Sequence, residues 1–210
     1  MRAISKVLTG VTAVGLAVTM TACSSSKGSS KPVGQFKTLT GNTTTVVLDS
    51  GFLSALTSLK LTPGLIGGAK LSGADLSFPI TGGNATIYKK GDVKPYVQGE
   101  VDHQGSGLTL KAGSTTVALK NFVIHPGNNS NLTGEVDVNG TVFAKSAKLF
   151  DLDGSTLKTP TIDSSGVATL EGTRVLLSSD AAAALDKAFG TTAVKGGLLV
   201  GTAIIKATGK

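Results

Sequence analysis

The sequence lacks tryptophan and has only two tyrosines and seven phenylalanines among its 210 residues. Its two histidines, His103 and His125, have no cysteine or glutamate at a spacing typical of zinc sites. There is also no Gly-x-Ser-x-Gly segment, no phosphate-binding glycine loop and no dinucleotide fingerprint. These absences argue against an enzyme and predict a protein without a metal centre.

Clustered positive charge is missing as well. Lysine and arginine total 20 against 13 acidic residues, a net charge of +7. Apart from Arg2, Arg174 is the only arginine, and the lysines are spread singly along the chain. With so few aromatic residues, this pattern excludes a nucleic-acid surface and favours a solvated, solubilising face. A weak attraction to anionic lipid or cell-wall polymer remains open.

Glycine is abundant, at 28 residues, and Thr, Ser and Val are frequent. This mixture suits many short strands joined by tight turns, and the length suits one domain. Strand-like segments recur at 39–48, 71–80, 85–88, 96–103, 108–111, 116–125, 132–143, 148–152, 167–177 and 198–205. We therefore expect a mainly β fold, a single antiparallel β-sandwich or barrel-like domain of ten to twelve strands with one or two short helices.

Two segments have helical spacing. Residues 52–59 predict a short helix capped by Asp49 or Ser50, and residues 178–189 predict a second helix capped by Ser179. Between them, the Asn-Gly pair at 139–140 predicts a tight hairpin. The Pro-Gly pair at 63–64 predicts a break.

The N-terminus has the three parts of an export signal. Arg2 and Lys6 form a cationic start, residues 7–20 form an apolar run, and Met-Thr-Ala precedes Cys23. The apolar run is too short for a stable membrane span and fits a signal peptide over residues 1–22. The Met-Thr-Ala-Cys segment resembles the bacterial lipobox.

That resemblance implies that Cys23 carries a diacylglycerol and becomes the first residue after cleavage. Residues 23–33 then form a Ser/Gly/Lys tether, and residues 34–210 form the β-rich extracytoplasmic domain. The processed chain has a net charge of +5, since Arg2 and Lys6 are removed. We expect the protein on the outer face of the cell membrane, with the lipid bilayer as its partner. The alternative is an ordinary secretory signal with a free cysteine.

The stretch 97–110 holds the main candidate site. Val101 and His103 fall on one face of a strand and Asp102 on the other, and glycines at 105 and 107 predict a β-bulge. A ligand can approach the backbone there, so His103, Asp102 and Tyr96 are the candidate ligand-binding residues. The alternatives are a half-buried histidine with one hydrogen bond, and a tyrosine that caps a strand.

The same stretch resembles the Gly-His-x-Gly-x-Leu segment of HtaA-type domains, β-rich surface modules of Actinobacteria that bind haem. The resemblance continues loosely through Phe122–Pro126 and through residues 179–201, an Ala-rich helix followed by a glycine turn. The resemblance implies a haem cofactor whose iron is bound by a tyrosine near the start of the domain. It also implies that His103 assists that tyrosine.

The chain departs from that pattern in two places. Residues 34–60 contain Phe36 and Phe52 but no tyrosine, and Asp102 stands where the family has glycine. A family member that kept the scaffold and lost the cofactor has the same features.

Three hypotheses remain open at this stage. The first is a lipid-anchored, non-catalytic module that binds an unknown small ligand or envelope component. The second is a module that binds haem or another small ligand. The third is an enzyme such as a polymer hydrolase, whose acids must be found among Glu100, Asp102, Glu135 and Asp137.

Overall fold

The computed structural model describes residues 30–210, and they form strands and two helices. The predicted signal peptide and Cys23 lie outside the described residues. The elements in chain order are β1 (Gly34–Phe36), β2 (Leu39–Leu48), α1 (Ser50–Ser58), β3 (Thr62–Gly67), β4 (Lys70–Ser72), β5 (Asp75–Pro79), β6 (Gly82–Ile87), β7 (Val97–Ala112), β8 (Thr115–His125), β9 (Asn131–Val138), β10 (Thr141–Asp153), a 3₁₀ turn (Gly154–Thr156), β11 (Thr161–Ile162), β12 (Ala168–Leu177), α2 (Ser179–Phe189) and β13 (Leu199–Gly209).

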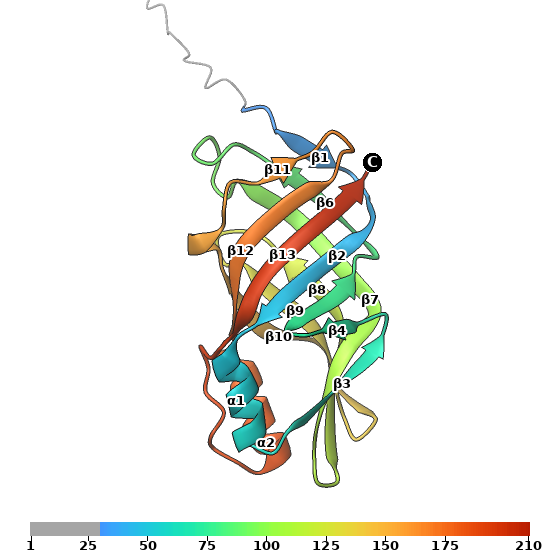
Figure 1. Ribbon diagram of the computed structural model, residues 1–210, viewed down its shortest axis with the longest axis vertical. Helices are drawn as coiled ribbons and strands as arrows, with labels where there is room; N and C mark the ends of the chain where they lie inside the picture. The colour runs from blue at the N-terminus through green and yellow to red at the C-terminus, as the bar shows by residue number, and fades with distance from the viewer. Residues whose placement is uncertain (1–29) are drawn as a thin grey trace, which may run out of the picture.

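One antiparallel sheet contains all thirteen of these strands (Figure 1). Its main order is β1-β6-β7-β8-β9-β10-β12-β13-β2-β5-β4. Strands β5 and β6 lie at opposite ends of this order, yet only Ile80 and Thr81 separate them in the chain. The two strands therefore act as one bent stave, paired first with β2 and then with β7. This stave closes the sheet into a barrel-like domain, as the sequence predicted.

Because neighbouring strands run in opposite directions, the connections alternate between two ends. The β6–β7, β8–β9 and β10–β12 connections lie at one end, which we call the loop end. Helices α1 and α2, which follow β2 and β12, lie together at the other end, the helix end (Figure 1). The helices thus cover one opening of the barrel and leave the other to loops.

Strand β7 is continuous over 16 residues and contains the predicted bulge. Its register with β8 shifts between His103 and Gly107. On its other edge, β7 pairs with β6 up to Asp102 and with β3 from Ser106 onward. The bulge therefore marks the point where β7 changes partners, and His103 lies at that seam.

The predicted hairpin is confirmed, with Asn139 and Gly140 at φ of 51° and 81°, between β9 and β10. Both predicted helices are also present. Asp49 accepts a hydrogen bond from the Gly51 N–H and caps α1. The cap of α2 is Ser178 rather than Ser179, because the Ser178 hydroxyl accepts from the Ala181 N–H.

Two strand expectations were wrong. The Pro-Gly pair at 63–64 does not break the chain but lies in β3, an edge strand in which proline needs no ladder partner. The structure also has thirteen strands rather than ten to twelve, since β1, β4 and β11 are too short to give a sequence pattern.

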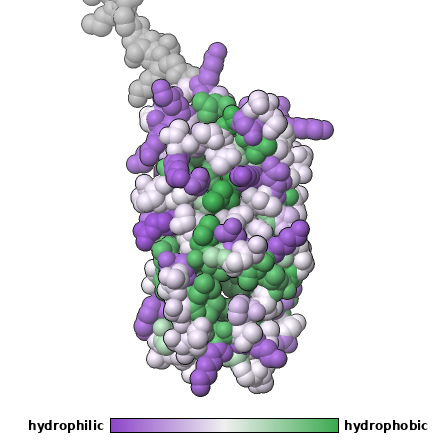
Figure 2. Space-filling view, viewed as in Figure 1, coloured by the Kyte–Doolittle hydropathy of each residue, from purple (hydrophilic) through white to green (hydrophobic). Residues whose placement is uncertain are grey.

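Buried apolar side chains form two clusters. The larger joins the helices to the strands and includes Leu56 of α1 and Leu185 of α2, while the smaller includes Phe36, Ile87 and Ile124. Both clusters draw on strands from the two halves of the described segment, 30–210. On the outside, Figure 2 shows an apolar band down the middle of the face viewed. Within the described part of the chain, no helix is long and apolar enough to cross a bilayer.

Candidate functional site

A cavity of about 700 Å³ lies inside the barrel. We call it the barrel cavity. Its walls come from inward-facing residues of most staves, including Val46, Val101, Ile124, Leu170 and Ile205. An eight-stave barrel is just wide enough for its interior to be filled by side chains or to hold one small ligand. Here small residues face inward, Ala168, Ala203 and Ala207, so the interior stays partly empty.

The mouth of the barrel cavity lies among the loops of the loop end. The lining includes Lys90 and Lys94 from the β6–β7 connection, Asn128 from the β8–β9 connection, and Asp153 at the end of β10. Asp153 is already engaged, because its carboxylate accepts from the Ser155 N–H at 2.9 Å and from Arg174 at 3.2 Å. These contacts hold the pKa of Asp153 below its usual value, with the Ser155 backbone as the largest cause. The rim therefore has one carboxylate, which is paired with an arginine, and two lysines.

Tyr96 lines this mouth, directly before β7. Its backbone carbonyl accepts from the Tyr88 N–H at 2.7 Å, which fixes the end of the β6–β7 connection. Burial raises the pKa of the Tyr96 phenol. The residue is thus a neutral, partly buried hydroxyl at the entrance.

His103 is deeply buried, with 1% of its surface exposed. Its Nε2 lies 2.8 Å from the Thr44 Oγ1 of β2, and the Phe78 ring meets it edge-on. Nδ1 has no hydrogen-bond partner. Burial lowers the pKa of His103 to about 4, and the nearby backbone of Phe122 and Val101 opposes this only in part. The imidazole is therefore neutral at physiological pH and ties β7 to β2 across the seam.

Asp102 does not join His103. Adjacent residues of a strand point to opposite faces, so Asp102 faces away from the barrel interior. Its backbone carbonyl accepts from the Thr81 N–H and hydroxyl, at 2.8 and 3.1 Å. Tyr96 precedes His103 by seven residues, roughly 20 Å along the strand. The three candidate residues thus occupy three places: the mouth, the outer face and the buried seam.

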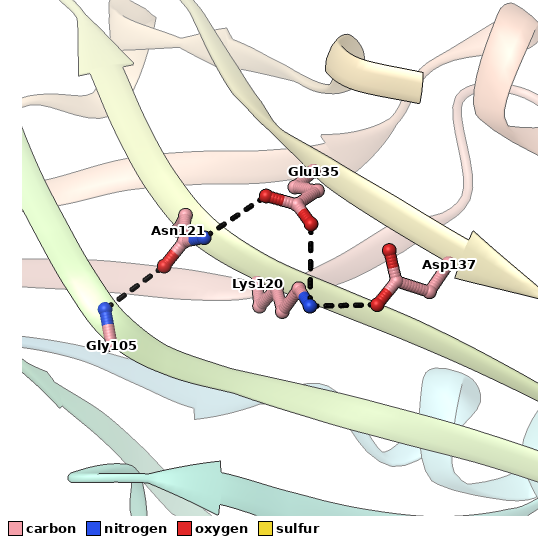
Figure 3. Close-up of polar contacts among 5 residues, drawn as sticks. All are labelled: Gly105, Lys120, Asn121, Glu135 and Asp137. Atoms are coloured by element: carbon pink, nitrogen blue, oxygen red, sulfur yellow. Dashed lines mark hydrogen bonds and ion pairs between the residues drawn. The ribbon is translucent and has the colours of Figure 1, made fainter. Parts of the chain in front are cut away.

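None of the candidate acids for an enzyme lines either cavity of the described residues, and this holds for Glu100, Asp102, Glu135 and Asp137. Glu135 and Asp137 both contact the Lys120 ammonium, at 3.2 and 2.7 Å (Figure 3). Asn121 links Glu135 to the Gly105 N–H of the bulge. The hydrogen bonds that the ammonium donates to Asp137 and then to Glu135 raise the pKa of Lys120. The two carboxylates therefore share one cation on the outer face, and Asn121 connects the group to the bulge.

A second cavity of about 590 Å³ lies between α2 and strands β8–β10. We call it the α2 cavity. Its walls include Leu119, Phe143, Leu149 and Ala184, and its charged residues are Lys148, Asp180 and Lys187. Among the described residues, no group of three or more His, Cys, Asp or Glu side chains is placed to hold a metal ion in either cavity or elsewhere.

Comparison with known proteins identifies the fold. No protein-family model and no curated protein sequence matches the chain. The crystal structure of the C-terminal domain of HtaA from Corynebacterium glutamicum superposes with a TM-score of 0.56 at 12% identity, covering 83% of this chain and 99% of that one. The chain has the HtaA-type fold. The heme binding protein HtaB from the same organism is similar at a TM-score of 0.48 and 13% identity, covering 81% of this chain and 94% of that one.

Within this HtaA-type fold, sequence reasoning found Tyr96 but missed the cavity that it borders. Lys90 and Lys94 were counted only among the lysines that are spread along the chain. The available sequence signal for the cavity is a set of small residues at inward positions of β12 and β13, namely Ala168, Ala203 and Ala207. It could be assigned to the interior only with the strand register known.

Proposed function

We propose that this chain is a membrane-anchored, extracytoplasmic lipoprotein whose β domain is non-catalytic and binds a small apolar ligand in the barrel cavity. The observation that carries the proposal is the cavity itself. Its volume of about 700 Å³ falls in the range of small-molecule sites, and apolar walls with a few polar groups at the mouth are typical of them.

The test is a fluorescence titration of the purified full chain with N-phenyl-1-naphthylamine, a neutral apolar dye. Ala168 is 1% exposed and lines the barrel cavity, so Ala168→Leu should fill part of it and weaken binding. Ala184→Leu is the matched control, because Ala184 lines the α2 cavity. Dye binding that survives Ala168→Leu and disappears in Ala184→Leu would contradict the proposed site.

The anchor part of the proposal depends on Cys23, which lies outside the described residues. The lipobox-like segment before it and the polar tether after it support lipidation and an extracytoplasmic position. Cys23→Ala and globomycin treatment should each change processing, and the variant should leave the membrane fraction. Unchanged membrane partitioning of Cys23→Ala would contradict the anchor.

Haem is the second candidate ligand. The HtaA-type fold favours it, and so does Tyr96 at the mouth, since tyrosine is an accepted haem ligand. The resemblance also implies a histidine that assists the tyrosine at the haem. The cavity lining does not supply this histidine, because His103 is hydrogen-bonded to Thr44 and does not line the cavity. The residues present thus do not fit the two-residue haem site of the family.

A hemin titration separates the two ligands. If the barrel cavity binds an apolar ligand and not haem, hemin should show no Soret shift that saturates at one equivalent. A Soret shift that disappears in Tyr96→Phe and persists in His103→Gln would establish haem at the mouth instead. A shift lost in His103→Gln would contradict the placement of His103 described above.

A further inference from the structure

The barrel cavity separates apolar and charged groups along its length. Its deep walls are aliphatic or aromatic apart from two threonines, Thr44, whose hydroxyl is paired with His103, and Thr173. Charged lining residues occur at the mouth alone, namely Lys90, Lys94 and Asp153. Asp153 is paired with Arg174, whereas neither lysine has an ion-pair partner among the described residues. A ligand that matches this pattern has a long apolar part and an anionic end.

The volume limits the apolar part to one chain. An apolar cavity of about 150 Å³ takes one benzene, or about 25 Å³ per carbon. By that measure, 700 Å³ holds on the order of 25 to 30 carbons. One long hydrocarbon chain fits with room to spare, and the two chains of an ordinary membrane phospholipid do not.

The mouth also lies at the end where the chain enters the domain. The Ser30 hydroxyl lies 3.5 Å from the Asp92 carbonyl oxygen, and the Val33 N–H donates to the Ile87 carbonyl at 2.8 Å. Seven residues connect Cys23 to Ser30, a reach of at most about 25 Å. A bilayer that holds the lipidated Cys23 is therefore close to Lys90 and Lys94.

We propose that the barrel cavity takes up the hydrocarbon chain of a single-chain anionic lipid, a fatty acid or a lysophospholipid, from the leaflet that holds the anchor. Lys90 and Lys94 bind the anionic end at the mouth. This rests on the proposed function and adds the ligand class to it. The chain leaves the bilayer interior for another apolar environment, and the head group stays near water.

The experiment measures displacement of N-phenyl-1-naphthylamine from the purified full chain by palmitate, hexadecanol and lysophosphatidylglycerol. Palmitate should bind about tenfold more tightly than hexadecanol, since two exposed ion pairs distinguish them. Lys90→Gln with Lys94→Gln should bring that ratio near one and leave hexadecanol binding unchanged. Lys111→Gln with Lys145→Gln, two exposed lysines at the helix end, should keep the ratio.

Chain length gives an independent check. Each removal of two methylenes from the fatty acid should weaken binding by roughly tenfold. Equal affinity of palmitate and hexadecanol, or tighter binding of dioleoyl phosphatidylglycerol than of the single-chain lipids, would overturn the ligand class and leave the apolar site standing. Failure of the dye itself to bind would overturn the proposed function as well.

Discussion

The barrel cavity and the α2 cavity have similar volumes, about 700 and 590 Å³, but differ in how they are bounded. Strands enclose the barrel cavity, and the loops around its mouth contribute two positive charges, from Lys90 and Lys94. A helix covers the α2 cavity, and its rim mixes Lys148, Asp180 and Lys187. Volume alone therefore does not distinguish a binding site from a packing defect.

The α2 cavity has a simple structural origin. Ala181, Ala184 and Ala188 are on the helix face that meets the sheet, and their methyl groups do not fill the space above β8–β10. The helix is nevertheless fixed at its start, because the Ser178 hydroxyl caps it and donates to the Lys148 carbonyl at 2.8 Å. The helix end therefore holds α2 against the sheet, whereas the loop end is where we propose that a ligand enters.

The largest expected effect on stability is at the helix end. Leu185→Ala removes a side chain that is 8% exposed and attaches α2 to the larger cluster. The free energy of unfolding should fall by about 3 kcal/mol in urea titrations. Leu53→Ala on α1, where the side chain is 40% exposed, should cost less than about 1 kcal/mol. Equal losses in both variants would contradict the structural role of α2.

The second effect concerns His103 at the buried seam of β7. The pKa of His103 is about 4 in the fold and about 6.5 in an unfolded chain, so protonation favours unfolding. Its contribution is fully present above about pH 6.5 and is lost as the pH falls toward 4.

Between pH 7.5 and pH 5, the wild type should therefore lose about 2 kcal/mol more stability than His103→Gln, which cannot titrate. Urea titrations at both pH values measure the difference. His125→Gln is the control, because His125 is only half-buried and contacts Thr133 at 3.0 Å. That control should retain the full acid loss, and a wild type no more acid-sensitive than His103→Gln would refute the neutral imidazole.

The smallest effects compare alanines enlarged to leucine. Ala168→Leu and Ala184→Leu each direct methyl groups toward a cavity. The free energy of unfolding, measured by thermal unfolding, should therefore change by less than about 1 kcal/mol. Ala182→Leu should cost about 1–3 kcal/mol, since Ala182 is 4% exposed and lines neither cavity. A cost at Ala168 as large as that at Ala182 would mean that the barrel interior is already filled.

Much of the fold was predictable because local chemistry fixed it. The Asn139-Gly140 pair set a hairpin, and the glycines after His103 set the bulge that lets β7 change partners. Alternation alone did not reveal that β5 and β6 form one bent stave. That closure depends on pairing between segments far apart in the chain, and no local pattern encodes it.

The site was less predictable than the fold. His103 was a candidate site residue because the sequence has only two histidines. In the structure its side chain is buried and hydrogen-bonded to Thr44. The cavity depends on which residues face inward together, and that requires the register of most staves. Five of the nine aromatic residues line the cavity, so inward alanines rather than a scarcity of aromatic residues leave the barrel interior partly empty.

The absence of tryptophan allows the most direct test of the barrel cavity as the ligand site. Tyr96→Trp puts the only tryptophan at its mouth, and Phe143→Trp puts one at the α2 cavity, where Phe143 is 62% exposed. Titration with 9,10-dibromostearate should quench the Tyr96→Trp emission, saturate at one equivalent and leave Phe143→Trp unchanged. Quenching at Phe143→Trp alone, or at neither position, would contradict the account.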